Sequence, residues 1–476
     1  MKFVVDKGPY LKDKDFTSKI MKKLFIALIP IIIFAVYKNG IIPYQNGYIT
    51  FYEALRPLFM IMIGGITAVI AEMLYVSLIL KKREKDFFSY IKHSYALFPG
   101  LFLALILPIN TPLWLVILGS LVATVLGKML FGGFGYNIFN PALIGYLFVS
   151  SSYGQLIAAR GGYLNGQELD SISKATPLTN ISNIAFVGSW NEIGAEFGSL
   201  SDYFFGFIPG SLGETSTFLI LIALIYLIIT KVVKWRIPII YITTVLIMTF
   251  IIGTYNGMEL WFPLFQLLSG GLMFGAVFIA TDPVTSPITK TGQTIYALGL
   301  GILTVVFRFL TPYPEGVMTA ILSMNLLVII IDRIGAKAKF SIKKTLLPVS
   351  IMIVTLFLIS FYIGHHISPR EVVDTRVNIV NVEKIEDKIT YVATVRAFVG
   401  LIKAELILEK DAIIEINIIE QNESYWQDIV NHDYINTLIK RQESIEEVNT
   451  IAGVTVTADA LKLLVIRVLE DYEERK

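Results

Sequence analysis

Long apolar runs recur along the first 364 residues of this chain. A transmembrane helix needs about 20 consecutive apolar residues. The mean hydropathy of +0.65 is too high for a soluble protein of 476 residues, of which 54% are hydrophobic. The sequence therefore predicts a polytopic α-helical membrane protein with eleven spans: 24–40, 55–80, 94–108, 113–130, 137–152, 215–231, 236–253, 259–280, 293–310, 316–332 and 345–364. The fifth run is short, which leaves a partly re-entrant segment as an alternative there.

Basic residues in the short connections give the orientation of these spans. Loops rich in Lys and Arg stay on the cytoplasmic side of a membrane. Four segments are of this kind: 1–23, 81–93, 231–236 and 332–344. Alternation through eleven spans puts all four on one side, so we expect a cytoplasmic N-terminal segment. The same alternation places the long loop 153–214, and everything after the last span, outside the cell membrane.

Residues 368–476 differ in character from the rest of the chain. They are charged, and the stretches ITYVATVR, LIKAELILEK and AIIEINIIE alternate as β-strands do. The final stretch, ADALKLLVIRVLEDYEERK, has the pattern of an amphipathic helix. We therefore predict a small extracytoplasmic α+β domain, tethered by the eleventh transmembrane helix at 345–364.

The apolar region contains a faint internal repeat. PGLFLALILPINTP, a Gly-containing span and FNPALIGYLF resemble GGLMFGAVFIATDPVTSP, LGLGILTVVF and PEGVMTAIL, in the same order. The first copy begins inside and the second begins outside. This pattern predicts an inverted repeat of two five-helix halves plus one extra helix, with a site at the interface of the halves.

Composition excludes several classes of function. The chain has no cysteine, so it supplies no thiolate for an iron–sulfur cluster or a zinc ribbon. A net charge of +2 does not suggest a nucleic-acid partner. No G-x-G-x-x-G follows a strand, so we expect that NADH is not bound by this chain.

Four motifs carry a resemblance to a known family: GGFGYNIFNPALIGY (132–146), GSLGETS (210–216), FIATDPVTSPITKTGQ (278–293) and YPEGVMTAILSMNLLVIIID (313–332). In this order they resemble the RnfD/NqrB family of membrane flavoproteins, over about residues 20–335. The resemblance implies a ten-helix membrane domain at 24–335. It also implies FMN esterified to a threonine, and a non-covalent riboflavin or FMN within the membrane domain.

The polar stretch DSISKATP in the outer loop carries the implied attachment site. Asp170 to Thr176 is similar to the family pattern Asp-x-x-Ser/Thr-Gly-Ala-Thr, except that Lys174 replaces Gly. The resemblance implies covalent FMN on Thr176, with Asp170, Ser173 and Ala175 completing the motif that a flavin transferase recognises. An ordinary Ser/Thr/Pro turn between helices is the alternative.

Residues 345–476 are similar to the FMN-binding protein RnfG/NqrC, which has one transmembrane helix and an outer domain. The implied attachment residue is Thr455, two residues after Gly453. Asn449, Ala452 and Val454 depart from the family's motif. The alternative is a domain that keeps the fold without the flavin and serves as a docking unit.

Ionisable residues inside membrane spans are expensive and are functional candidates by default. Three are ion-linked candidates here: Glu72, Asp282 and Arg308. Arg308 could instead extend to the outer surface, and Asp282 could be an exposed residue at a helix end. Glu72 lies in the middle of its span and could pair with a polar group across the repeat interface.

The sequence thus predicts a membrane protein that moves electrons across the bilayer by flavins, as part of a larger complex. Electrons would pass from an inner-face donor, through a membrane flavin and covalent FMN, to an extracytoplasmic acceptor. Ion translocation could be coupled to this flow. The expected partners are the lipid bilayer, a flavin transferase, and other Rnf-like membrane proteins or an inner-face reductase. The alternative is a small-solute or cation transporter with an inverted-repeat fold and no redox role.

Overall fold

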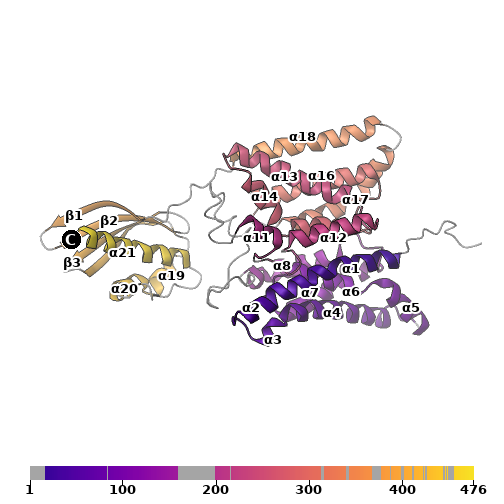
Figure 1. Ribbon diagram of the computed structural model, residues 1–476, viewed down its shortest axis with the longest axis horizontal. Helices are drawn as coiled ribbons and strands as arrows, with labels where there is room; N and C mark the ends of the chain where they lie inside the picture. Colours follow the sequence, from indigo (N-terminus) through magenta and orange to yellow (C-terminus); the bar gives the residue numbers. More distant parts are fainter. Residues whose placement is uncertain are drawn as a thin grey trace, which may run out of the picture. The chain divides into compact units, whose positions relative to one another are not determined.

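The computed structural model describes two compact units, Met1–Pro369 and Arg370–Lys476, which are considered separately (Figure 1). In the first unit it describes residues 17–158 except 83, residues 199–338 except 209, 215 and 312–315, and residues 342–366. In the second unit it describes residues 377–475 with short gaps at 386–387, 398–400, 410–411, 422, 424–425, 443–444, 446–447 and 449–454.

The first unit is a bundle of helices. Its N-terminal part comprises α1 (Thr17–Val36), the π-helix η1 (Tyr37–Ile41), α2 (Ile42–Gln45), α3 (Phe51–Ala54), α4 (Arg56–Leu78), α5 (Glu84–Ser94), α6 (Leu97–Ile106), α7 (Leu113–Val125), the 3-10 turn η2 (Met129–Phe131) and α8 (Pro141–Ala158). The remainder comprises α11 (Leu200–Phe205), α12 (Thr217–Ile229), α13 (Arg236–Tyr255), α14 (Trp261–Leu268), α15 (Leu272–Phe274), the π-helix η4 (Gly275–Ile279), α16 (Lys290–Leu310), α17 (Val317–Ala338) and α18 (Ile342–His366).

The two halves of this bundle repeat one order of elements. In the first half α4 packs against α6 and α7, and α7 packs against α8. In the second half α13 packs against α14 and α16, and α16 packs against α17. The third span is incomplete in both halves: α6 has 10 residues, and α14 is bent by 62° from the segment Leu272–Ile279. This correspondence agrees with the predicted repeat.

Glycine allows the closest helix contact of the first half. A Cβ placed on Gly100 of α6 would overlap the backbone oxygen of Gly64 in α4. This overlap leaves no room for any side chain at position 100. Small residues at such positions let helix backbones approach closely, as is common in membrane proteins.

Every predicted span coincides with a helix or a helix pair, but not all are complete crossings. Among the described residues, seven helices are long and apolar enough to cross a membrane, or eight if the bent pair is one span. Helices α6 and α12 are shorter than a crossing, because Pro108 follows α6 and Thr230 ends α12. The eighth run is broken, at Gly270 with φ +68°. The fifth run, for which a partly re-entrant segment was the alternative, forms α8, whose backbone is non-helical at Tyr153 and which is not among the seven long helices.

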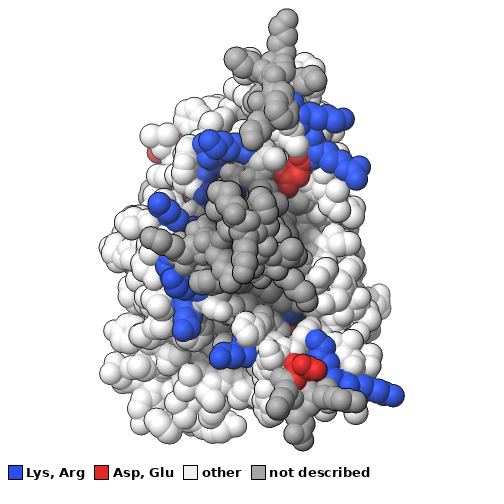
Figure 2. Space-filling view, turned by 90° about the vertical axis from the view of Figure 1, so that its right-hand side faces the viewer, with Lys and Arg blue, Asp and Glu red and all other residues white. Residues whose placement is uncertain are grey.

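The basic connections lie at one end of the bundle. Figure 2 views this end and shows Lys and Arg side chains around it, with fewer acidic ones. Hydrogen bonds tie the connections together: Lys23 Nζ donates to the Thr230 carbonyl (3.1 Å) and Lys234 Nζ to the Ile288 carbonyl (3.4 Å). We call this end the basic face.

The second unit is an antiparallel sheet with helices. The strands β1 (Asn378–Ile385), β2 (Lys388–Arg396), β3 (Leu401–Glu409) and β4 (Ala412–Glu420) pair in sequence order. Helices α19 (Trp426–Asn431), α20 (Tyr434–Lys440) and α21 (Thr455–Arg475) follow, and α21 packs against β2. The alternation of β3, whose every second side chain is buried, explains why α21 finds an apolar face to cover. The predicted strands and terminal helix are confirmed.

Candidate functional site

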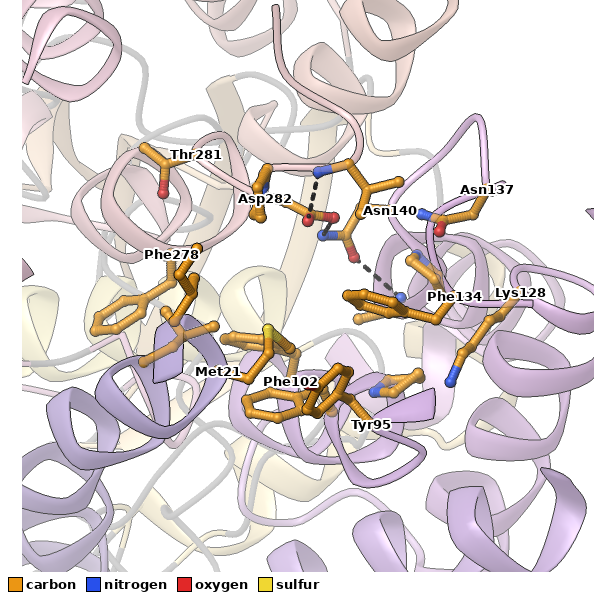
Figure 3. A pocket seen from close by; sticks show the side chains of 18 of the residues that line it. Met21, Tyr95, Phe102, Lys128, Phe134, Asn137, Asn140, Phe278, Thr281 and Asp282 are labelled. Atoms are coloured by element: carbon orange, nitrogen blue, oxygen red, sulfur yellow. Dashed lines mark hydrogen bonds between the residues drawn. The ribbon is translucent and has the colours of Figure 1, made fainter. Parts of the chain in front are cut away.

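A pocket opens in the first unit near the basic face (Figure 3). Segments far apart in the sequence build it: the start of α1, α6, the connection from α7 to α8, the α12–α13 loop, and the end of η4 with the residues after it. It therefore lies where the two halves of the repeat meet, as the sequence predicts. Its lining divides into an aromatic wall and a polar side.

Aromatic side chains form the apolar wall of the pocket: Tyr95, Phe98, Phe102, Phe134 and Phe278. The rings contact one another, with 4.9 Å between the centroids of Tyr95 and Phe134 and 5.9 Å between those of Phe98 and Phe102. The Tyr95 hydroxyl is also hydrogen-bonded to Ser18 of α1 (2.8 Å). This packing fixes the wall in place. Flat, apolar ring systems are the ligands that such walls accept.

Asn140 and Asp282 lie across the pocket from Phe102 and Tyr95 (Figure 3). Asn140 Nδ2 donates to Asp282 Oδ2 (3.3 Å), and Asn140 Oδ1 accepts from the Ala142 backbone N–H (3.1 Å) at the start of α8. Asp282 also accepts from the Val284 N–H (3.1 Å) and the Thr285 hydroxyl (3.2 Å). Burial raises the pKa of Asp282 above its ordinary value. The Asp282 side chain is half-buried and accepts three hydrogen bonds, so the alternative of an exposed helix-end residue is wrong.

Asn325 of α17 extends this network away from the pocket. Its Oδ1 accepts from the Asn140 N–H (3.2 Å), and its Nδ2 donates to the Thr285 carbonyl (3.1 Å) and the Tyr296 hydroxyl (3.2 Å). Asn140 belongs to the first half of the repeat, whereas the other three residues belong to the second. The polar side of the pocket is therefore a joint between the halves. A satisfied buried network of this kind holds its members in one arrangement.

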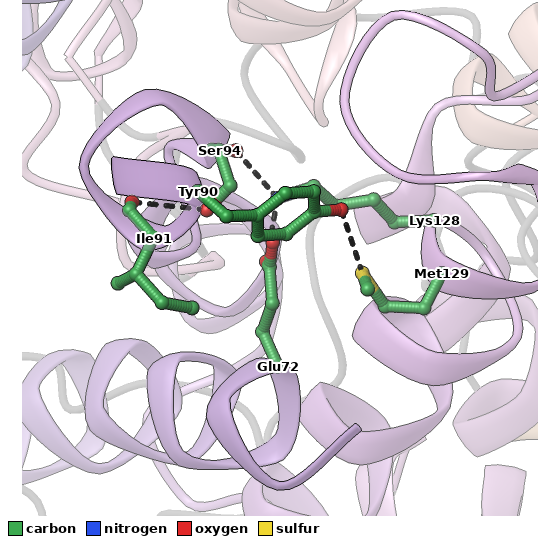
Figure 4. Close-up of polar contacts among 6 residues, drawn as sticks. All are labelled: Glu72, Tyr90, Ile91, Ser94, Lys128 and Met129. Atoms are coloured by element: carbon green, nitrogen blue, oxygen red, sulfur yellow. Dashed lines mark hydrogen bonds and ion pairs between the residues drawn. The ribbon is translucent and has the colours of Figure 1, made fainter. Parts of the chain in front are cut away.

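Glu72 and Lys128 form a buried ion pair beside the pocket (Figure 4). Lys128 Nζ donates to Glu72 Oε2 (2.6 Å) and to the Ser94 carbonyl (2.6 Å). The Glu72 side chain is 0% exposed and the Lys128 side chain is 2% exposed. Lys128 also lines the pocket. A partner for Glu72 across the repeat interface was one possibility from the sequence. Glu72 pairs instead within the first half, because α4 packs against α7, and Lys128 lies three residues after α7 ends.

Arg308 stabilises the end of the broken helix α14 by hydrogen bonds, a role that we call a brace. Its guanidinium donates to the carbonyl and side-chain oxygens of Gln266 and to the Ser269 carbonyl (3.3 Å), at the C-terminal end of α14. The side chain is buried, so it does not extend to the outer surface as the alternative had it. Arg56 does the same for the segment after α6, donating to the carbonyls of Ile109 and Asn110. A cation suits the C-terminal end of a helix, where carbonyls lack partners.

The segment 211–214 of the GSLGETS motif connects these two breaks. The Gly213 N–H donates to the Leu105 carbonyl (2.7 Å), and the Leu212 N–H to the Leu107 carbonyl (3.2 Å). Glu214 is buried beside Gly271, where an added Cβ would lie 2.5 Å from the carboxylate oxygen. The motif therefore has a structural role between the halves.

The implied flavin-attachment residues receive no structural test. Thr176, Asp170, Ser173 and Ala175 lie outside the described residues, as does Gly453. Thr455 is the first residue of α21, and its side chain is likewise outside the description. Two residues later, the buried Thr457 hydroxyl donates to Glu423 Oε2 (2.7 Å).

Sequence reasoning missed three residues of the site: Lys128, Asn140 and Asn325. Lys128 lies inside the predicted span 113–130 but was not chosen among the charged candidates, although a charge within a span was a usable signal. Asn140 lies within the predicted span 137–152 and directly precedes α8, which begins at Pro141. Nothing in the sequence indicated that Asn325, in the middle of an apolar run, would join it.

Comparison with known proteins covers the membrane unit. The model of the NQR2, RnfD, RnfE family matches residues 4–341. One component of the proton-translocating ferredoxin:NAD(+) oxidoreductase complex of Clostridium ljungdahlii is 34% identical over 342 residues, 72% of this chain and 97% of that protein. Its counterpart in the Na(+)-translocating ferredoxin:NAD(+) oxidoreductase complex of Acetobacterium woodii is 32% identical over 347 residues, 72% of this chain and 97% of that protein.

A different type of complex is also represented among the relatives. One component of the Na(+)-translocating NADH-quinone reductase of Chromohalobacter salexigens is 38% identical over 249 residues, 49% of this chain and 56% of that protein. The family match ends at residue 341, before the second unit begins. Over most of its length, this chain is a polytopic helical membrane protein that belongs to the NQR2, RnfD, RnfE family.

Proposed function

We propose that this chain is the flavin-bearing membrane component of an ion-translocating oxidoreductase complex. It would pass electrons from an inner-face donor, through a flavin in the membrane unit and FMN on Thr176, to an extracytoplasmic acceptor. The observation that carries the proposal is the pocket with an aromatic wall and a polar side, near the basic face of a chain in this family. Relatives are named as components of ferredoxin:NAD(+) oxidoreductase complexes.

The pocket suits a non-covalent riboflavin or FMN. An isoalloxazine ring is flat and apolar on its faces and carries hydrogen-bond donors and acceptors along its edges. Phe102 and Phe134 offer surfaces for the faces, while Asn140, Asp282 and Lys128 offer groups for the edges. When bound, the flavin would supply the redox chemistry, and the protein would supply position and electrostatics.

The covalent sites complete the proposed route. Thr176 would carry FMN through a phosphoester that a flavin transferase forms, with Asp170, Ser173 and Ala175 as the recognised motif. Thr455 is a second proposed site, in a domain similar to RnfG/NqrC. If the second unit carries FMN, its tether at 345–364 would raise the local concentration of acceptor near Thr176.

Ion translocation is part of the proposal, because relatives are named for moving protons or sodium ions. The acidic groups suited to such coupling are Glu72, with one carboxylate oxygen that has no hydrogen-bond partner among the described residues, and Asp282. Arg308 acts in this proposal as a brace for the broken helix and carries no ion. Other membrane proteins of an Rnf-like complex would be its partners.

A solute or cation transporter remains the competing function. In inverted-repeat transporters, free carbonyls at broken helices bind the coupling cation. Here Arg56 and Arg308 already donate to the carbonyls beside α6 and α14. This occupation favours the electron-transfer proposal over a cation site at those two positions.

Electron transfer into liposomes tests the proposal. The chain would be purified from cells that express a flavin transferase and reconstituted into liposomes that contain cytochrome c, with dithionite added outside. We expect the entrapped cytochrome c to be reduced faster than in protein-free liposomes, and Thr176→Ala to slow this reduction. Thr455→Ala shows whether the second proposed site also takes part in this reduction. Reduction at the protein-free rate, together with solute uptake by the flavin-free chain, would establish the transporter instead.

A further inference from the structure

We propose that Lys128 is the cation that stabilises a reduced, negatively charged ring in the pocket, and that Glu72 is a positioning residue for its ammonium. This inference rests on the proposed function, because it takes a flavin as the ligand. It goes beyond that function by assigning the redox preference of the site to one side chain. Three properties of Lys128 support it: a spare donor, a balanced charge and a fixed position.

A lysine ammonium has three N–H donors. Lys128 Nζ uses one on Glu72 Oε2 and one on the Ser94 carbonyl, both at 2.6 Å. The third has no acceptor within the described part of the chain. Because Lys128 also lines the pocket, a ligand there is the available acceptor. Ring nitrogens and carbonyl oxygens of a flavin are acceptors of the required kind.

The charges around Lys128 are balanced when the ligand is neutral. Glu72 and Lys128 sum to zero, and a buried pair with this geometry needs no further counter-ion. One electron added to a neutral ring by a one-electron donor leaves one negative charge and breaks no bond. Lys128 would then face two negative groups, the carboxylate and the ring, and could donate to both. In a low-dielectric site, the attraction between the Lys128 ammonium and a negatively charged ring is stronger than in water.

Glu72 explains why the ammonium stays at the pocket edge. Lysine has a flexible stem of four carbons, so an unanchored ammonium would turn toward water. Glu72, on α4, and the Ser94 carbonyl, at the end of α5, hold it from two elements. The second carboxylate oxygen of Glu72 has no hydrogen-bond partner in the described chain. Glu72 can therefore accept one more hydrogen bond, and Lys128 can donate one more.

A purely structural ion pair is the competing explanation, and it makes different predictions. Such a pair would contribute to stability regardless of the redox state of any ligand. It would also leave the relative affinity for oxidised and reduced flavin unchanged when both charges are removed together. A binding measurement in the two redox states therefore distinguishes a redox role from a structural one.

The test uses the full chain in lipid nanodiscs and free riboflavin, without oxygen, oxidised or reduced by dithionite. The double variant Lys128→Met/Glu72→Gln removes both charges and avoids leaving one of them buried alone. Lys290→Met, an exposed basic residue at the start of α16, is the matched control for the general potential of the basic face. Binding is measured at a pH where free reduced riboflavin is an anion, and again where it is neutral.

We expect the wild type and Lys290→Met to bind anionic reduced riboflavin about tenfold more tightly than oxidised riboflavin, or about 1.4 kcal/mol. The double variant should lose this preference, because its affinity for the anionic reduced form should fall much more than its affinity for the oxidised form. The wild-type preference should also fall at the pH where reduced riboflavin is neutral, which checks the inference even if the double variant does not fold. If the preference is the same in the double variant as in the wild type, or the same at both pH values, the role of Lys128 is overturned, but the flavin assignment of the pocket is not. No riboflavin binding by the wild type in either state would overturn the flavin assignment of the pocket as well.

Discussion

Single charged residues decide what the interior of this membrane unit can do. Sequence reasoning selected Glu72, Asp282 and Arg308, because charge inside an apolar run is costly and therefore has a purpose. It could not assign those purposes. The partner of Glu72 is 56 residues away in the chain and that of Arg308 is 42 residues away, so only the fold brings them together. Of these three, Arg308 serves structure, Asp282 lines the pocket, and Glu72 pairs with Lys128, which also lines it.

Asp282 makes stability depend on pH with a definite sign. Burial raises its pKa in the folded protein above the value in the unfolded chain. As pH rises, the unfolded chain loses this proton first, so the folded state holds more protons between the two pKa values. Its contribution to stability is therefore full below the unfolded pKa and is lost as pH rises through the folded pKa.

The substitution Asp282→Asn isolates this effect. The asparagine retains an oxygen that can accept from the Val284 N–H, but it has no carboxyl group to titrate. We expect the melting temperature of the wild type to fall from mildly acidic to neutral pH more steeply than that of the variant, measured in the same detergent. Identical slopes for the two proteins would show that Asp282 does not titrate in this range.

At the scale of elements, the incomplete helices distinguish this bundle from a set of simple spans. Apolar runs predicted where helices occur, and each predicted run has one. The runs could not show that α6 stops after 10 residues or that α14 and Leu272–Ile279 differ in direction by 62°. Such breaks depend on partners for the freed carbonyls, and those partners come from distant elements. Arg308 supplies such a partner for α14, and the Gly213 N–H supplies one for α6.

Replacing Arg308 tests its role as a brace. Arg308→Met keeps the apolar stem and removes the donors to the Gln266 and Ser269 carbonyls. Leaving buried acceptors without partners costs about 1–3 kcal/mol, so we expect a clear drop in melting temperature. Arg333→Met, at an exposed position of α17, is the matched control and should have little effect. Equal melting temperatures for Arg308→Met and the wild type would refute the brace.

At the scale of the whole molecule, composition alone separated the two units. The change from apolar runs to alternating, charged stretches near residue 368 agrees with the boundary between Pro369 and Arg370. The predicted strands of the second unit are present, because alternation with period two is a strong local signal. The pocket was not predictable in the same way. It needs five segments, from α1 to the residues after η4, and no single stretch of sequence contains it.

Flavin on Thr176 is the central claim about this chain. The direct measurement is the intact mass of the protein, denatured and purified from cells that express a flavin transferase. We expect one FMN-phosphoryl addition that disappears in Thr176→Ala, and a second addition only if Thr455 is also used. A chain of unmodified mass, or an addition that persists in Thr176→Ala and disappears in no single-threonine variant, would contradict the claim.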